Sequence, residues 1–178
     1  MSKSVSVAPM MDCTDKHELY FLSLISKNVK LYTEMIVSNA IIRGDREKLL
    51  SFKKINNHVT LQLGGSDPKE LAEACKIAED YGYQEINLNL GCPSKKVQKN
   101  KFGACLMKEP DLVGRCIDSM SSATKLPVSA KTRIGYNDLE NFDFLKKFIL
   151  KIKNSGSEKF IIHARRAILT KLSPKQNL

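Results

Sequence analysis

The sequence predicts an α/β fold, and within that class a (β/α)₈ TIM barrel that stops after about six of its eight strands. Short apolar runs alternate with amphipathic runs, and polar residues lie at or near the ends of five apolar runs. The alternation predicts a parallel sheet. An open doubly wound sheet uses mainly the crevice at its switch point, whereas a barrel gathers all its strand ends around one site. The polar strand ends therefore favour the barrel.

Six short runs predict the strands, because each is rich in β-branched residues or Leu and is bounded by Gly, Pro or Asn. They cover residues 5–8, 31–35, 59–63, 86–90, 127–131 and 160–163. A full barrel has eight strands in about 250 residues. We therefore expect residues 1–178 to form one incomplete barrel domain.

The intervening runs predict helices, most clearly over residues 67–81. Asp67 can cap this helix, Pro68 suits its first turn, Glu70 has the capping-box spacing and Gly82 can end it. Further helices are expected at 16–26, at 45–52, at 111–121, and from near 138 to just before Gly156.

The composition indicates one globular domain. The 178 residues are 42% hydrophobic and 27% charged, which excludes collagen-like, coiled-coil and wholly disordered chains. The formal net charge of +10 fits either a polyanionic partner or a well-solvated basic surface.

Targeting and cysteine patterns predict a cytoplasmic protein, which we expect to be a monomer. The N-terminus lacks a signal-peptide pattern, and no run approaches the roughly 18 apolar residues of a membrane helix. The five cysteines include no CxxC pair, so neither a zinc site nor a disulfide framework is expected.

Five strand ends carry the polar candidates, which are Glu34, Gln62, Asn89, Lys131 and His163. The Gln62 amide can donate and accept, which suits the edge of a heterocycle. Lys131 is informative, since an inward lysine is costly unless it meets an anion or acceptors. His163 could be structural, but the arginine that soon follows it favours a functional reading.

Other candidates leave alternatives open. Pro9 and Met10 could approach a flat ligand or simply end a strand beside the core. Asn87 points to the same side as Asn89, and either a ligand or backbone could satisfy this amide pair. Cys105 follows a glycine in a loop and could act as nucleophile or acid, or could simply pack.

Two features qualify these candidates. Cys92 is a rival thiol to Cys105. A basic collar is expected around the strand ends, suited to a phosphate backbone or, for 95–101, to a solvated loop. Its members are Lys95, Lys96, Lys99, Lys101, Arg133, Arg165 and Arg166.

Seven segments in this order resemble the tRNA-dihydrouridine synthase family, specifically its DusA-type branch. They are Ala8-Pro9-Met10, Leu31-Tyr32-Thr33-Glu34-Met35, Leu61-Gln62-Leu63-Gly64-Gly65, Glu85-Ile86-Asn87-Leu88-Asn89-Leu90-Gly91-Cys92-Pro93-Ser94, Phe102-Gly103-Ala104-Cys105-Leu106-Met107, Lys131-Thr132-Arg133-Ile134-Gly135 and Ile161-Ile162-His163-Ala164-Arg165.

The resemblance implies an FMN enzyme that uses NADPH to reduce a D-loop uridine of tRNA, in the position 20 and 20a region. It places Pro9 and Met10 against the flavin, and Gln62 and Asn89 at its ring edge. It places Lys131 near flavin N1 and O2.

The resemblance also implies roles for the remaining candidates. His163 contacts FMN toward its ribityl-phosphate side, and Cys105 is the proton donor in preference to Cys92. We expect Asn87, Arg133 and Arg165 to contact the substrate.

The resemblance also implies that two further strands and a helical tRNA-binding domain are missing after residue 178, since 172–177 match a mid-protein family segment. Two alternative functions remain at this stage. One is an FMN barrel oxidoreductase acting on a free pyrimidine, and the other is an inactive RNA-binding fragment.

Overall fold

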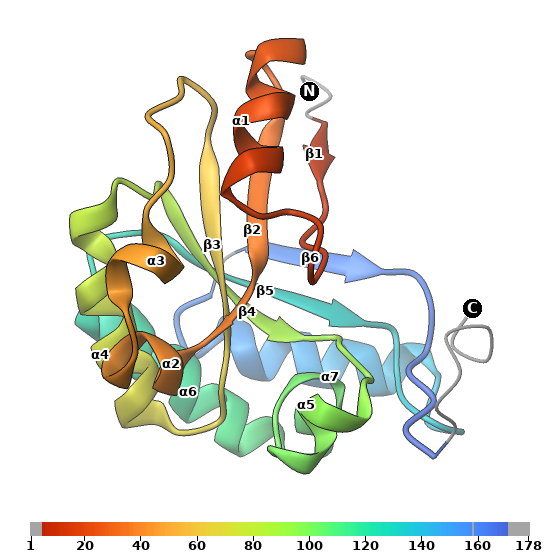
Figure 1. The fold of residues 1–178 in the computed structure, drawn as a ribbon. Coiled ribbons are helices and arrows are strands. Elements are labelled where there is room, and N and C mark those ends of the chain that lie inside the picture. The colour runs from red at the N-terminus through yellow and green to blue at the C-terminus, as the bar shows by residue number, and fades with distance from the viewer. Residues whose placement is uncertain (1–4, 158, 171–178) are drawn as a thin grey trace.

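Six parallel strands form one curled sheet, which confirms the predicted fold class. The computed structural model describes residues 5–157 and 159–170. The strands are β1 (Ser6–Val7), β2 (Lys30–Val37), β3 (Val59–Gly64), β4 (Glu85–Leu90), β5 (Val128–Arg133) and β6 (Lys159–His163). Each pairs in parallel with the next in chain order, and the sheet curls into part of a barrel (Figure 1).

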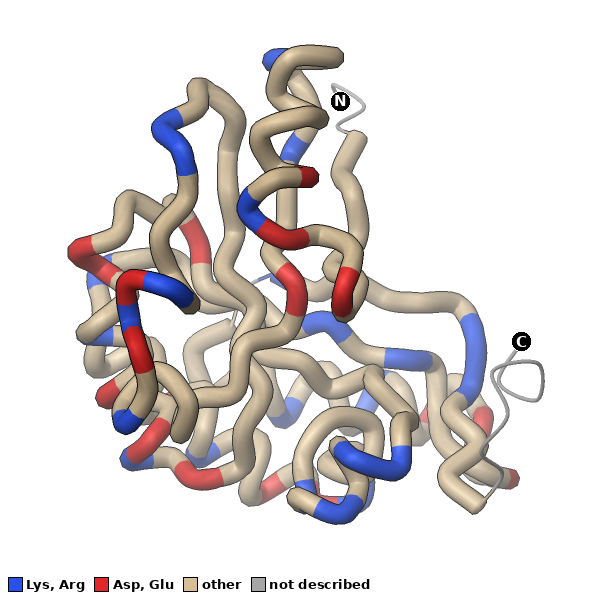
Figure 2. Tube along the Cα trace, in the orientation of Figure 1, with Lys and Arg blue, Asp and Glu red and all other residues tan. Residues whose placement is uncertain are grey.

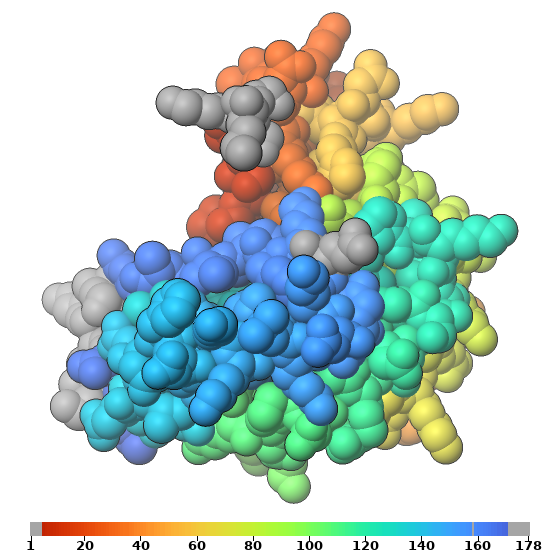
Figure 3. Space-filling view, turned by 180° about the vertical axis from the view of Figure 1, so that it is seen from behind, coloured from red at the N-terminus to blue at the C-terminus, as the bar shows by residue number. Residues whose placement is uncertain are grey.

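Helices connect consecutive strands. They are α1 (Lys16–Ile25), α2 (Ser38–Arg43), α3 (Arg46–Leu50), α4 (Pro68–Ala78), α5 (Lys95–Lys99), α6 (Pro110–Ala123) and α7 (Phe142–Lys153), with 3₁₀ helices η1 (Glu79–Tyr81) and η2 (Gly103–Lys108). Helices α2, α4, α6 and α7 pack side by side in that order. Seen from behind, the light-blue surface of α7 and the darker surface of β6 cover one side of the molecule (Figure 3).

The core lies between the central strands and these helices. Every residue of β3 and β4 is buried, as expected for parallel strands covered on both faces. Helix α4 buries the apolar face predicted from its periodicity, with Leu71, Ala74, Cys75 and Ala78 inward. Asp67 caps this helix through bonds from the Lys69 and Glu70 amides, and Gly82 follows η1 with a φ of +81°.

A buried carboxylate ties three strands together at their N-terminal ends. Glu85, the first residue of β4, accepts from the Lys30 ammonium of β2 at 2.5 Å and from the Lys159 ammonium of β6 at 2.8 Å. The Glu85 side chain is 4% exposed, and His58 Nε2 lies 3.7 Å from it. We call Lys30, Glu85 and Lys159 the basal clasp.

Several helices differ from the sequence prediction. The helix expected from near residue 138 begins at Phe142, because Asn141 caps it by accepting from the Phe144 amide. Helices α2, α5 and η2 were not predicted, since five or six residues are too few for a recognisable 3.6-residue period. The segment 95–101, considered as a solvated loop, contains α5.

A bulge in β2 corrects the expected position of Glu34. Tyr32 pairs with Thr60 and Met35 pairs with Gln62, so β2 carries one extra residue between these pairs. The bulge shifts the alternation of the strand, and Met35 and Val37 face the carboxyl-end cleft instead of Glu34. Glu34 lies within β2 and accepts a hydrogen bond from the Asp12 amide at 2.9 Å.

The predictions for the N-terminal residues 1–4 and for the tail segment 172–177 lie outside the described residues. Among the residues that are described, no helix is long and apolar enough to cross a membrane.

Candidate functional site

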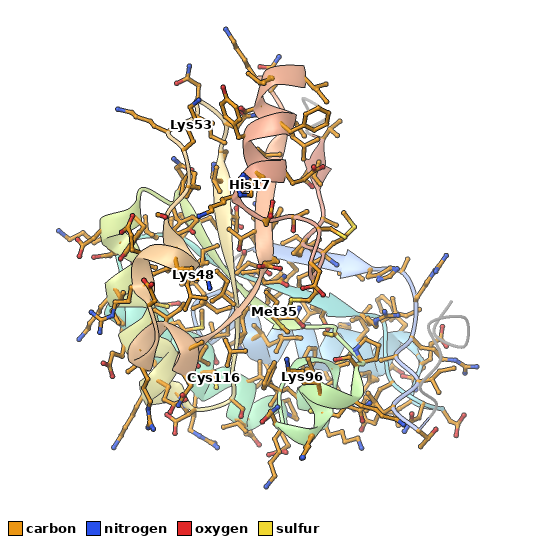
Figure 4. The ribbon with its side chains drawn as sticks, in the orientation of Figure 1. His17, Met35, Lys48, Lys53, Lys96 and Cys116 are labelled. Carbon is orange, nitrogen blue, oxygen red and sulfur yellow. The ribbon has the colours of Figure 1, made fainter. Side chains whose placement is uncertain are left out.

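A cleft of about 940 Å³ lies at the carboxyl ends of the strands. Residues in or directly after β2, β3, β4, β5 and β6 line it, and α5 contributes Lys96. Figure 4 shows Met35 near the centre of the molecule with Lys96 on α5 below it. The volume is in the range of sites for small molecules and cofactors.

The structure brings six of the ten predicted site residues together in this cleft. They are Pro9, Gln62, Asn89, Lys131, Arg133 and His163. Asn87 is fully buried beneath the cleft, and Met10 is half exposed beside it. Cys105 is half-buried and Arg165 is exposed, and neither lines the cleft.

The amides at the floor of the cleft bond to one another. The Asn89 amide group donates to Gln62 Oε1 at 2.7 Å, and the Gln62 amide group donates to Asn87 Oδ1 at 2.8 Å. Asn89 Oδ1 in turn accepts from the backbone N–H groups of Gly91 and Cys92. Backbone and side-chain partners thus satisfy much of the asparagine pair, and a ligand as a further partner stays a prediction.

The β2 bulge also supports Gln62. The Gln62 backbone N–H donates to the Thr33 hydroxyl at 3.0 Å, beside the position where the β2–β3 register shifts. A side chain thus satisfies a buried donor at the bulge, which keeps Gln62 in place.

Lys131 and His163 form the basic end of the cleft. Within residues 5–157 and 159–170, the half-buried Lys131 ammonium has no hydrogen-bond or ion-pair partner. Burial lowers its pKa, and so does the neighbouring Arg133 charge. The pKa of His163 is lowered by burial and by the charges of Arg133, Lys131 and Arg165, so its imidazole is neutral at pH 7. This end of the cleft suits an acceptor-rich or anionic group.

Arg133 faces the cleft but holds the backbone around it. Its Nε donates to the Gly91 carbonyl at 2.8 Å, and its Nη1 donates to the Arg166 carbonyl at 3.1 Å. The guanidinium therefore joins the segment after β4 to the segment after β6. Its predicted contact with substrate remains a prediction.

The two thiols near the cleft differ in position. Cys92 lines the cleft, whereas the Cys105 thiol lies in η2 and donates to the Phe102 carbonyl at 3.0 Å. Burial raises the pKa of Cys105, so this thiol carries its proton at neutral pH. A protonated thiol is the state that a general acid requires.

Close packing fixes η2 against the cleft wall. Gly103 has a φ of +73°, and a Cβ placed there would lie 2.5 Å from Val97 Cγ1 and 2.6 Å from the Cys92 carbonyl oxygen. The Ala104 amide donates to that same carbonyl at 2.9 Å. Glycine is therefore required at the start of the segment that carries Cys105.

Basic residues gather around the cleft. Lys95, Lys96 and Lys99 lie on α5 and are exposed, and Arg165 and Arg166 follow β6. Figure 2 shows Lys and Arg on α5 and on the segments that end β5 and follow β6. Six members of the predicted basic collar are therefore at the surface, whereas Arg133 is buried.

Sequence reasoning missed part of the cleft wall. Met35 and Val37 line it because of the bulge, and Ser38, Asn39 and Glu70 also line it. A polar Ser-Asn pair directly after an apolar strand was the available signal.

The family model for dihydrouridine synthases matches residues 6–178. The chain belongs to the dihydrouridine synthase family. It is 50% identical over 173 residues to the tRNA-dihydrouridine(20/20a) synthase of Synechocystis sp., covering 97% of this chain and 52% of that relative. It is 51% identical over 174 residues to the enzyme of the same name from Vibrio cholerae, covering 97% and 53%. The chain spans about half the length of these relatives.

The chain was also compared with solved structures and searched for groups of metal-ligating side chains. A single-residue variant of the carboxyl transferase domain of Rhizobium etli pyruvate carboxylase aligns to 92% of this chain and 26% of that chain at 13% identity, with a TM-score of 0.49. Within the part of the chain that the structure describes, no three His, Cys, Asp or Glu side chains gather as metal ligands do.

Proposed function

We propose that this protein takes part in the FMN-dependent reduction of uridine to 5,6-dihydrouridine in tRNA, at positions 20 and 20a as in the names of its relatives. The observation that carries the proposal is the cleft, in which Lys131 and a pair of amides lie together at the carboxyl ends of parallel strands. Family membership and the basic collar support the same function.

The residues of the cleft fit FMN. The half-buried Lys131 ammonium has no partner among the described residues and offers three donors to an electron-rich ring edge. Gln62 and Asn89 each use one amide N–H on a neighbour and keep a second. Pro9 and Met35 add apolar wall on which a flat ring could lie. Lys131, Gln62, Asn89 and His163 would hold the cofactor.

The chemistry of the reduction requires a hydride donor, a proton donor and a group that stabilises negative charge. When bound, FMN recharged by NADPH supplies a hydride to C6 of the uracil. We assign delivery of the proton to C5 to the Cys105 thiol, as the resemblance of residues 102–107 to the family implies; its raised pKa keeps its proton on the thiol at neutral pH. The Lys131 charge would favour the electron-rich form of a flavin ring bound beside it.

The tRNA contacts belong to the basic collar. A uridine within a folded RNA must be drawn out to reach a cleft among strand ends. Exposed lysines of α5 and the arginines after β6 surround that cleft and can bind phosphates. Arg133 and Asn87 support the cleft from the sides and from below.

The test combines binding and turnover. The protein is incubated with FMN, NADPH and tRNA lacking dihydrouridine, and dihydrouridine is measured by mass spectrometry, with free uridine as the comparison substrate. We expect product in tRNA only. Product from free uridine would favour an enzyme of free pyrimidines, and failure to bind FMN would contradict the proposal.

Lys131→Ala tests the cofactor contact separately. We expect weaker FMN binding and a more negative flavin midpoint potential, because the cation that favours the reduced ring is absent. Lys96→Ala is the matched control, since Lys96 also lines the cleft but lies on α5. Equal flavin midpoint potentials in the two variants would show that Lys131 does not lie beside the flavin ring.

A further inference from the structure

A chain of hydrogen bonds runs through the interior of the sheet, from the cleft to the basal clasp. We call Asn89, Gln62, Asn87, Ser129 and Glu85 the amide chain. Beyond the two bonds at the cleft floor, the Asn87 amide group donates to Ser129 Oγ at 2.9 Å, and the Ser129 hydroxyl donates to Glu85 Oε1 at 2.6 Å. Glu85 and Asn89 are four residues apart on β4, roughly 13 Å along a strand.

The strand register explains why these side chains meet. Asn87 pairs with Gln62 on one side and with Ser129 on the other, so the three side chains lie in one row across β3, β4 and β5. Gln62, Asn87 and Ser129 are each at most 1% exposed. Water therefore cannot replace a missing partner in this row without a rearrangement.

The direction of the amide chain is fixed at both ends. An ionised carboxylate only accepts, so Ser129 must donate to Glu85, and the Ser129 oxygen is left to accept from Asn87. Backbone N–H groups only donate, so Asn89 must turn its oxygen toward Gly91 and Cys92. The bonds at the Glu85 end and the bonds at the Asn89 end are therefore compatible with the same orientation of the Asn87, Gln62 and Asn89 amides.

The clasp keeps the acceptor end charged. Burial by itself would raise the pKa of Glu85, but hydrogen bonds from Lys159, Lys30 and Ser129 outweigh burial and lower it. His58 and Tyr32 also lie near this carboxylate. Glu85 thus stays an acceptor at neutral pH, far from the cleft.

We infer that Ser129 is a positioning residue: it holds the Asn87 amide from beneath the cleft, and through Asn87 it reinforces the orientation of Gln62 and Asn89 that the Gly91 and Cys92 N–H groups also favour. The amide chain leaves one N–H of Gln62 and one of Asn89 for a ligand, which selects a planar ring with carbonyl or nitrogen acceptors at its edge. This inference rests on the proposed function for the identity of the ring, but its geometry does not. Neither Ser129 nor Asn87 lines the cleft.

The test uses Ser129→Ala, with Ser129→Thr as the variant that restores the hydroxyl. The first readout is the set of side-chain amide resonances of Asn87, Gln62 and Asn89 in the ligand-free protein. The second is affinity for lumiflavin, which has the ring but no ribityl phosphate. We expect Ser129→Ala to move all three sets of resonances and to weaken lumiflavin binding roughly tenfold, as for the removal of one buried hydrogen bond. Ser129→Thr should restore both.

Thr60→Val is the matched control, because the Thr60 hydroxyl is buried on β3, two strands from Ser129, with no hydrogen-bond partner among the described residues. It should leave resonances and affinity unchanged. If Ser129→Ala does not fold, Ser129→Cys replaces it, since a thiol keeps the volume but bonds weakly.

The outcomes separate the two proposals. A Ser129→Ala protein with wild-type lumiflavin affinity, or with unmoved Gln62 and Asn89 resonances, overturns the positioning role. A wild-type protein that binds neither FMN nor lumiflavin, but whose resonances move in Ser129→Ala, contradicts the proposed cofactor and supports the positioning role.

Discussion

Cys105 and Cys92 lie on either side of Phe102, in segments joined by the bond from the Ala104 amide to the Cys92 carbonyl. Cys92 faces the cleft, whereas Cys105 points its thiol to the Phe102 carbonyl. Position in this structure favours Cys92, and the resemblance of 102–107 to the family favours Cys105. A rate measurement decides between them.

We expect Cys105→Ala to bind FMN as the wild type does and to lose roughly 10²–10⁴ in the rate of dihydrouridine formation, the usual loss for a missing general acid. Cys92→Ala is the matched control and should keep most of the rate. Single-turnover reduction of tRNA by the prereduced protein measures both. A larger loss in Cys92→Ala would reverse the assignment.

Glu85 gives a pH-dependent prediction. Its folded pKa lies below the unfolded value of about 4.3, so its contribution is complete above that value and is lost as pH falls through the folded pKa. Glu85→Gln should lower the free energy of unfolding on the order of 2 kcal/mol at pH 7, and by less as pH falls below about 4. Urea unfolding of both proteins across this range measures the difference, and a difference independent of pH would contradict the prediction.

Among the elements, η2 begins with a glycine that both backbone conformation and packing require. Gly103→Ala should destabilise the protein by about 3 kcal/mol, because it adds a clash to the strain of a positive φ. Gly82→Ala is the control, since φ there is +81° and nothing lies within 4 Å of the added Cβ. It should cost about 1 kcal/mol. Urea unfolding measures both values, and equal losses of stability would show that the neighbours of Gly103 move aside.

At the scale of elements, the sequence predicted the strands and helices whose residue patterns are long enough to show a period. The strands and α4 were predicted to within a few residues, because burial imposes a periodicity on each of them. For α4, Asp67 also marks the start of the helix as its N-cap. The short α2 and α5 have no such period, and two consecutive polar residues, Thr33 and Glu34, do not by themselves show which strand pairing contains the extra residue. The missed bulge explains why Glu34 was expected at the cleft and Met35 was not. The amide chain depended on register between strands, which a single sequence does not reveal.

For the whole molecule, part of the net charge of +10 is carried by lysines and arginines near the cleft. Replacing Lys95, Lys96, Lys99 and Lys101 with Ala should weaken tRNA binding and reduce its salt dependence by about 0.7–0.9 in log–log slope for each phosphate that is no longer neutralised. The matched control replaces four lysines outside the 95–101 segment, namely Lys53 and Lys54 in the loop before β3 and Lys146 and Lys147 on α7. Filter binding across salt concentrations measures both. Equal slopes for the two variants would show that the charge acts without a preferred surface.

The basal clasp also has a consequence for folding kinetics. Its carboxylate is separated from Lys30 by 55 residues and from Lys159 by 74, so its bonds close only after long loops have formed. Interactions that form after the transition state slow unfolding and leave the folding rate almost unchanged. Lys159→Met should therefore unfold faster in stopped-flow experiments while refolding at the wild-type rate. The clasp is then a latch on the finished sheet, which lengthens the lifetime of the native state rather than guiding the chain toward it.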